Sequence, residues 1–65
     1  MDLTQGLRHV REGERITRLS WNNSSIVVCL ESGLLRIRME DRLYHPWNIS
    51  EVDMYSNDWE VVPDA

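Results

Sequence analysis

The sequence predicts a single α+β domain over residues 1–65, in which an N-terminal helix packs on a small antiparallel sheet and a short helical turn precedes the last strand. Three observations support this prediction: an apolar stripe at helical spacing near the N-terminus, short β-branched or alternating runs separated by turn residues, and a second capped helical turn near the C-terminus. A domain of this size buries only about 60% of its unfolded surface, so association of subunits would stabilise it.

The predicted N-terminal helix begins at Asp2, which can cap it together with Gln5 at the capping-box position, and ends at Gly13. Its apolar residues recur at helical spacing and are Leu3, Leu7 and Val10. Gly6 lies on the same helix and costs about 1 kcal/mol relative to alanine, so we expect a close packing partner beside it. The apolar stripe is expected to face the sheet.

The first two strands are predicted at 15–17 and 26–30, on either side of a polar loop at 22–25. The segment 18–21 leads out of the first strand and places Trp21 at the edge of this loop. Residues 26–30 form a continuous apolar run rich in β-branched side chains, which favours a strand that is apolar on both faces. We expect the N-terminal helix to cover one face and another subunit to cover the other.

A hairpin turn is predicted at 31–33, followed by a strand in which apolar residues alternate with Arg36 and Arg38. These two arginines point the same way, either as a solvated face paired with nearby glutamates, which we favour, or as a phosphate site. Another turn at 40–42 leads into residues 43–45, which are expected to extend the sheet.

The C-terminal part of the chain places Trp47 and Trp59 six residues to either side of Asp53. Ser50 precedes Asp53 by three positions, the spacing at which a hydroxyl and a carboxylate can reciprocally cap a starting helix. We therefore predict a short helix over about 51–56. Asp53 is interpreted either as a helix cap alone or as a polar group that contacts a ligand.

The last strand is predicted at 58–62, before Pro63 ends it, and Asn57 is expected to end the helix in a left-handed conformation. Trp59 is assigned to the core because its strand and flanking valines bury it most naturally. Trp21 and Trp47 have two interpretations, packing in the core or stacking on a flat ligand.

Composition excludes several classes of function. The net charge is -4, with 11 acidic and 7 basic residues, which argues against broad electrostatic attachment to nucleic acid or to an anionic membrane. All the basic residues are arginines, whose planar fork suits phosphate or carboxylate. No apolar run has the length of a signal peptide or membrane helix. Cys29 is the single cysteine, which rules out an internal disulfide and fits a cytoplasmic location.

Candidate catalytic groups are few. The sequence has no glycine-rich phosphate loop, no metal-ligand cluster, and no serine or cysteine nucleophile with an obvious histidine and carboxylate. His9 and His45 are each interpreted as surface or half-buried residues. Because so small a chain has little room to enclose a reacting centre, we predict that it is not an enzyme and uses no cofactor or metal.

The spacing of Trp47, Ser50, Asp53, Asp58 and Trp59 carries a family resemblance. The run PWNISEVDMYSNDWEVV is similar to the C-terminal signature of the second Thoeris anti-defence family, which consists of phage proteins. The N-terminal half resembles the same family through the helix LTQGLRHVREG, a basic strand and the run TRLSWNN. The resemblance spans about residues 3–62 and implies a small α+β fold that assembles as a dimer of dimers.

The resemblance also implies a function. Such proteins sequester cyclic nucleotide immune signals without cleaving them; family ligands include cyclic ADP-ribose isomers and, for some members, cyclic di- or trinucleotides. Carried over to this sequence, Trp21 and Trp47 would stack on the ligand, Arg18 and Asn22 would be their polar neighbours, and Asp53 would contact ribose hydroxyls or base edges. The protein would act in the cytoplasm of the host bacterium, with itself as a further partner.

The chain departs from the family pattern at Leu3, where an aromatic residue is usual, at Asn23, where the family has glycine, and at Tyr55 and Ser56, where leucine and alanine are common. The tight hairpin at 31–33 also replaces a segment that is often longer. These departures leave open whether the assembly is a homodimer or a homotetramer, and they affect ligand preference.

Two other interpretations stay open. In the first, the protein is an inhibitor whose acidic surface mimics nucleic acid and blocks a bacterial defence nuclease such as Cas9. The acidic residues near the C-terminus are Glu51, Asp53, Asp58, Glu60 and Asp64. In the second, the chain is a structural or regulatory phage module without a small ligand.

Overall fold

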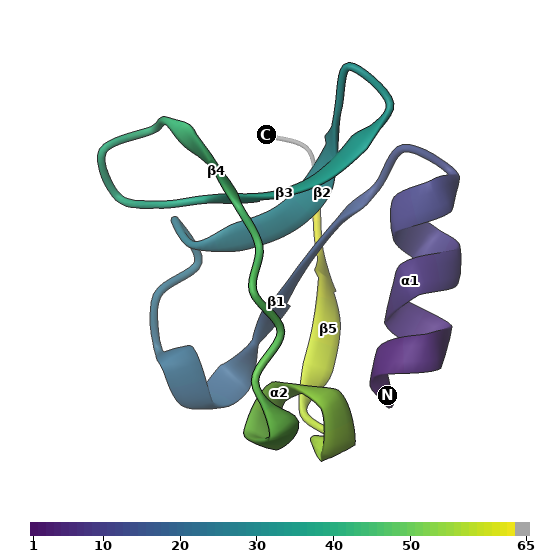
Figure 1. The fold of residues 1–65 in the computed structure, drawn as a ribbon. Helices are drawn as coiled ribbons and strands as arrows, with labels where there is room; N and C mark the ends of the chain where they lie inside the picture. Colours follow the sequence, from purple (N-terminus) through teal and green to yellow (C-terminus); the bar gives the residue numbers. More distant parts are fainter. Residues whose placement is uncertain (64–65) are drawn as a thin grey trace.

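The computed structural model describes residues 1–63 and confirms the predicted α+β class (Figure 1). The elements are, in chain order, α1 (Leu3–Arg11), β1 (Arg15–Arg18), the 3-10 turn η1 (Leu19–Trp21), β2 (Val27–Glu31), β3 (Leu34–Arg38), β4 (Tyr44–Pro46), α2 (Glu51–Tyr55) and β5 (Trp59–Val62). The strands form one antiparallel sheet in the order β4-β3-β2-β1-β5. The last strand thus returns to the sheet edge beside β1, where α1 lies alongside both strands.

Helix α1 has the predicted capping box. The amide of Gln5 donates to Asp2 Oδ1 at 2.8 Å, and the amide of Asp2 donates to Gln5 Oε1 at 3.1 Å. The helix ends at Arg11 with Glu12 as its C-cap, and Gly13 follows with a φ of 95°, which only glycine adopts without strain. A Cβ built on Gly6 would lie 2.9 Å from Ile16 Cδ1, so the close packing partner expected beside this glycine is β1.

The core lies between α1 and the sheet. Its buried residues are Leu3, Val10, Ile16, Val28 and Trp59. Trp59 is 2% exposed, which confirms its assignment to the core. The register pairs Arg18 with Trp59 and Ile16 with Val61, so these four side chains share the face of the sheet that α1 covers.

The side chains on the second face of β2 are already covered within the single chain. Val27 is fully buried and Cys29 is 7% exposed within the single chain. The register places Arg38 opposite Val27 and Arg36 opposite Cys29, so the aliphatic stems of two arginines flank these side chains. Burial raises the pKa of the Cys29 thiol, although the charge of Arg38 opposes this rise, and the thiol is therefore a poor nucleophile.

Turn geometry agrees with the sequence at one site and differs at another. A hairpin turn is confirmed within the predicted 31–33 segment; its two loop residues, Ser32 and Gly33, have φ values of 52° and 77°. The prediction that Asn57 ends the second helix in a left-handed conformation is wrong. Instead α2 ends at Ser56, whose φ of -77° and ψ of 150° are extended and carry the chain directly towards β5.

Candidate functional site

Three tryptophans form one cluster at the end of the sheet. Trp21 ends η1, Trp47 follows β4 and Trp59 opens β5. The ring centroids of Trp21 and Trp59 lie 5.3 Å apart at an interplanar angle of 83°, and those of Trp47 and Trp59 lie 5.8 Å apart at 76°. Both outer indoles therefore pack edge-on against the buried central ring, which fixes their positions while leaving them partly exposed.

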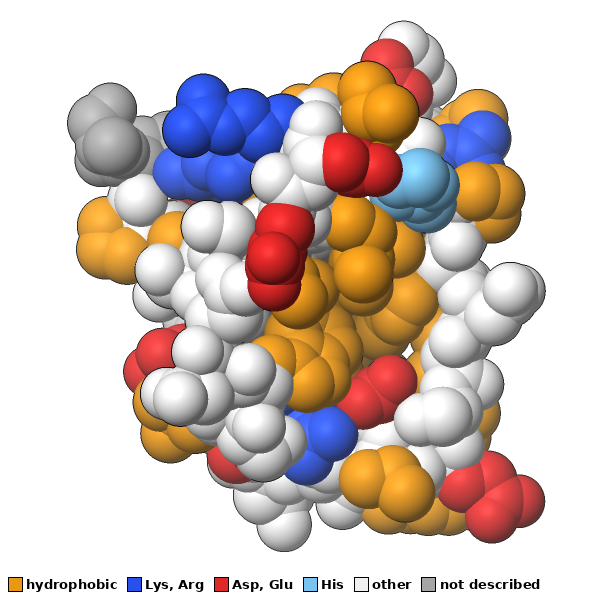
Figure 2. All heavy atoms as spheres, turned by 90° about the vertical axis from the view of Figure 1, so that its left-hand side faces the viewer, with side chains coloured by type: hydrophobic (Ala, Val, Ile, Leu, Met, Phe, Trp, Pro, Cys, Tyr) orange, Lys and Arg blue, Asp and Glu red, His pale blue; other side chains and the backbone are white. Residues whose placement is uncertain are grey.

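The two outer indoles line an open hollow of about 460 Å³. Its lining residues are Trp21, Ile26, Ile37, Met39, Pro46, Trp47, Asn48 and Asp53. Figure 2 shows a hollow lined by hydrophobic side chains, with an acidic and a basic side chain at its edge. The site thus combines apolar and aromatic walls with two polar groups, the amide of Asn48 and the carboxylate of Asp53.

Arg18 connects the hollow to the beginning of β5. Its Nη1 donates to Asp53 Oδ1 at 2.9 Å, and its Nε donates to Asp58 Oδ1 at 2.8 Å. Only 11% of the Arg18 side chain and 15% of the Asp53 side chain are exposed. The guanidinium therefore holds the two carboxylates in a fixed arrangement, with Asp53 on the side of the hollow.

The ion pair between Arg18 and Asp58 persists at neutral pH. The hydrogen bond from Arg18 lowers the pKa of Asp58 to about 2, and the backbone amide of Ser20 contributes through its own bond of 2.9 Å. The hydrogen bond with Asp58 in turn raises the pKa of Arg18. Two carboxylates thus share one guanidinium. We call Arg18, Asp53 and Asp58 the clamp, and its formal net charge is about -1.

Asp53 is held by its backbone as well as by its side chain. Its amide donates to Ser50 Oγ at 3.2 Å, which confirms Ser50 as the cap of α2. The carboxylate of Asp53 does not complete the reciprocal cap that the sequence predicted. It accepts a hydrogen bond from Arg18 instead. The carbonyl of Asp53 also accepts a hydrogen bond of 3.1 Å from Trp59 Nε1, which ties α2 to the core.

The structure brings four of the five candidate ligand residues together. Trp21, Trp47 and Asp53 line the hollow, and Arg18 contacts it through Asp53. Asn22 does not line the hollow; together with Arg18 it lines a smaller concavity of about 290 Å³. Its φ of 50° caps η1 in a left-handed conformation, so its role within the chain is local.

Sequence reasoning missed two contributions to the site. Asp58 was recognised as part of the family signature and of an acidic group but given no role in the site, although it anchors Arg18. Ile37 and Met39 were assigned to one face of a strand, and the structure shows that this face forms a wall of the hollow. The alternation of apolar residues in 34–39 is the signal that could have identified this wall, once the facing partner was known.

Comparison with known proteins identifies one family. The model of the Thoeris anti-defense 2-like domain matches residues 1–62. A search among curated proteins gives no match. Within the part of the chain that the structure describes, no helix is long and apolar enough to cross a membrane.

Proposed function

The chain belongs to the Thoeris anti-defense 2-like family, which supports a role against bacterial defence, and we propose that it performs this role by binding a cyclic nucleotide immune signal in the tryptophan-lined hollow. The protein would be made by a phage or prophage and act in the cytoplasm of the host cell. It would withhold the signal from its effector by sequestration, with cyclic ADP-ribose isomers and cyclic oligonucleotides as the candidate ligands.

The observation that carries this proposal is the pair of partly exposed indoles held edge-on by Trp59 beside Asp53. Flat nucleobases stack on such rings, and each stacked base contributes about 1–3 kcal/mol. The hollow of about 460 Å³ lies within the range typical of small-molecule sites, about 300–1,000 Å³. Because the central ring fixes the two walls before binding, little conformational entropy is lost when a ligand enters.

The charge of the site selects the part of the nucleotide that it can accept. Arg18 donates to Oδ1 of Asp53. Within residues 1–63 no hydrogen bond is made to Oδ2, so this oxygen is available to a ligand. A carboxylate oxygen accepts from ribose hydroxyls or an exocyclic amine and repels phosphate. We therefore expect a base and its ribose in the hollow, with the phosphates directed towards solvent.

The same contacts support binding without turnover. The carboxylate of Asp53 is paired with Arg18, so it is poorly placed to transfer a proton. The lining residues of the hollow include no histidine, cysteine or serine that could attack a glycosidic or phosphodiester bond. We therefore propose that the ligand is released unchanged.

A calorimetric titration with cyclic ADP-ribose isomers and cyclic di- and trinucleotides tests the proposal. We expect one member to bind, and Trp47→Ala to weaken its binding about 5- to 150-fold, as the loss of one stacked base predicts. Trp47→Phe, which keeps an aromatic ring against Trp59, separates stacking from folding. Tyr44→Ala is the matched control, because Tyr44 is an exposed aromatic residue that does not line the hollow.

Two outcomes would contradict the proposal. The first is a folded wild-type protein that binds no member of the panel, and the second is a folded Trp47→Ala variant that binds as tightly as wild type. Chromatography of the ligand recovered after heat denaturation tests the absence of turnover separately. Recovery of a cleaved ligand would show that the protein acts by catalysis and not by sequestration.

The alternative of an acidic nuclease inhibitor has less support. Asp53 and Asp58 share Arg18, and their side chains are only 15% and 28% exposed. Asp64 lies outside the described residues; within residues 1–63, Glu51 and Glu60 are the exposed acidic residues of the proposed mimic. Two glutamates make a weak imitation of a phosphate backbone, which carries one charge per about 1.7 Å of duplex.

A further inference from the structure

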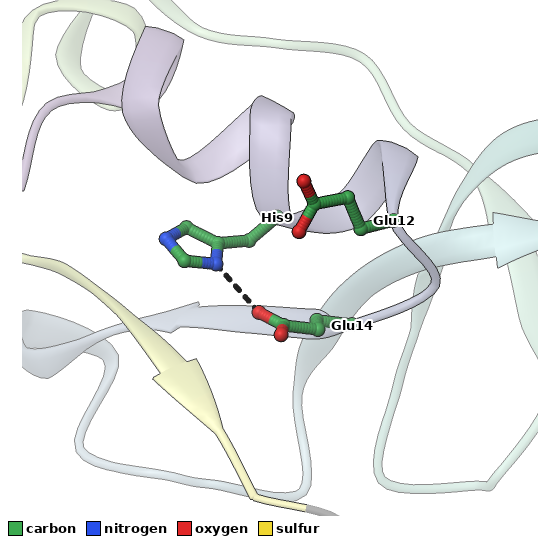
Figure 3. Close-up of side chains that lie close together, drawn as sticks. All are labelled: His9, Glu12 and Glu14. Carbon is green, nitrogen blue, oxygen red and sulfur yellow. Dashed lines mark hydrogen bonds and ion pairs between the residues drawn. The ribbon is translucent and has the colours of Figure 1, made fainter.

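A cluster of metal-ligand side chains lies at the C-terminal end of α1, away from the hollow. The donor atoms of His9, Glu12 and Glu14 all lie within 4.8 Å of one another, and His9 Nδ1 is 2.6 Å from Glu14 Oε2 (Figure 3). We propose that this cluster binds a late first-row divalent metal, with Zn²⁺ as the representative ion. His9 Nδ1 and one carboxylate oxygen from each glutamate would be the ligands.

The backbone holds these three residues together. His9 and Glu12 are three positions apart at the end of the helix, so they lie on the same face. The turn at Gly13 then folds the chain back, with the amide of Gly13 donating to Val10 O and that of Glu14 donating to His9 O, each at 3.0 Å. This pair of hydrogen bonds is the Schellman motif, and it brings Glu14 beside His9.

The donor set determines the class of metal. One imidazole nitrogen and two carboxylate oxygens suit Zn²⁺, Co²⁺ or Ni²⁺ better than Mg²⁺ or Ca²⁺, which prefer oxygen ligands alone. The carbonyl end of α1 adds negative potential. Arg8 borders the same side and opposes a cation, so two carboxylates are needed to give the cluster its negative charge.

Rotation of the three side chains would close the cluster on a metal, because donor atoms that now lie within 4.8 Å of one another have to reach the spacing of ligands around one ion. Ligand atoms about 2.0–2.1 Å from a tetrahedral ion lie about 3.3 Å from one another, so the present contact between His9 and Glu14 would lengthen by about 0.7 Å. Their side chains are 42% and 44% exposed and can rotate by this amount. A hollow of about 370 Å³ beside His9 and Glu12 leaves room for water at the remaining position.

Metal binding would join the end of α1 to the chain entering β1, because Glu14 directly precedes that strand. The ion would take the place of the hydrogen bond between His9 and Glu14 and would link two elements of the core. We therefore expect Zn²⁺ to raise the melting temperature of the metal-free protein.

The test is a titration of the chelator-treated protein with Zn²⁺, followed by calorimetry, and with Co²⁺, followed by its visible spectrum. We expect one ion per chain, and at least about tenfold weaker binding by His9→Gln and by Glu14→Gln. The matched control is His45→Gln, because His45 is also exposed and also hydrogen bonded to an acid, Asp41, but has no second carboxylate in a cluster. It should bind as wild type does.

Equal affinity of wild type and His9→Gln would overturn the proposal, as would a loss of binding in His45→Gln alone. Absence of Zn²⁺ binding at millimolar concentration would overturn it as well. Circular dichroism confirms that each variant is folded, which is expected because the substituted side chains lie on the surface. The result is independent of nucleotide binding, since none of these residues lines the tryptophan-lined hollow.

Discussion

At the scale of single residues, Asp58 influences the geometry of the hollow without lining it. It anchors Arg18 at 2.8 Å, and Arg18 holds Asp53 at 2.9 Å. Of these three residues, only Asp53 lines the hollow and would contact a ligand there. Asp58 therefore acts as a positioning residue, and its contribution should be visible in stability as well as in binding.

We expect Asp58→Asn to destabilise the protein at neutral pH and to make its free energy of unfolding depend less on pH in the acidic range. A carboxylate whose pKa falls to about 2 on folding stabilises the protein above its unfolded pKa, about 3.9, and this contribution is lost as the pH falls through about 2. Because Asp58 is partly exposed, the contribution is on the order of 1 kcal/mol.

Urea unfolding at pH 7, 4 and 2 measures this effect. The difference in unfolding free energy between wild type and Asp58→Asn should be largest at pH 7 and should shrink towards pH 2. Glu60→Gln, two residues further along the chain and exposed, is the control and should change stability by less than about 0.5 kcal/mol. A difference that stays constant over this pH range would show that the ion pair is not its source.

At the scale of elements, features set by neighbouring residues were predictable and features set by distant contacts were not. The capping box of α1 and the turn at Ser32 and Gly33 depend on residues within a few positions of one another, and both are confirmed. The pairing of Arg18 with Asp53 spans 35 positions. This ion pair forms because β5 returns to lie beside β1, and no local sequence pattern indicates that pairing.

The error at Asn57 has the same origin. Asparagine tolerates a left-handed conformation, but α2 has only five residues and is held by Ser50 and by the indole of Trp59. These tertiary contacts determine how the chain leaves the helix. An extended Ser56 brings Asp58 towards Arg18, so the clamp and the helix end are consistent with each other.

The contact between α1 and β1 gives a prediction at this scale. A methyl group at Gly6 would lie 2.9 Å from the terminal carbon of Ile16, which can rotate only slightly because Ile16 is fully buried. Alanine gains about 1 kcal/mol in helix propensity, which offsets part of the strain, so we expect Gly6→Ala to cost less than about 1 kcal/mol.

Gly6→Val adds two further methyl groups at the same place and should cost about 2 kcal/mol or more, because it separates α1 from the sheet. Thermal and urea unfolding of both variants measure these costs. Thr4→Val places valine at an exposed position of the same helix and should change stability by less than about 0.5 kcal/mol, because threonine and valine have similar helix propensities. Equal costs for Gly6→Val and Thr4→Val would show that close packing at Gly6 is unimportant.

At the scale of the whole molecule, the sequence predicted the fold class, while the strand order and the hollow required the structure. The apolar runs establish that there is a sheet, but they do not say which strands are neighbours. The hollow exists because η1, the end of β4 and α2 meet around Trp59. The tryptophans could be named from sequence, but their joint surface could not.

The exposed apolar residues of α2 provide the last prediction. Val52 and Tyr55 are three positions apart on this helix and are 68% and 76% exposed. A domain of this size is marginally stable alone, so we propose that a second copy of the chain covers this face. Light scattering after gel filtration should show a dimer or tetramer for wild type and a smaller species for Val52→Asp.

Leu43→Asp is the matched control, because Leu43 is 60% exposed but lies in the turn before β4. It should leave the assembly unchanged, and a monomeric wild type would contradict the prediction. Val52 neighbours Asp53, so the monomeric variant also tests where the ligand site is built. If the hollow alone forms the site, a folded Val52→Asp monomer should keep its nucleotide affinity, whereas a large loss would show that the second copy contributes a wall.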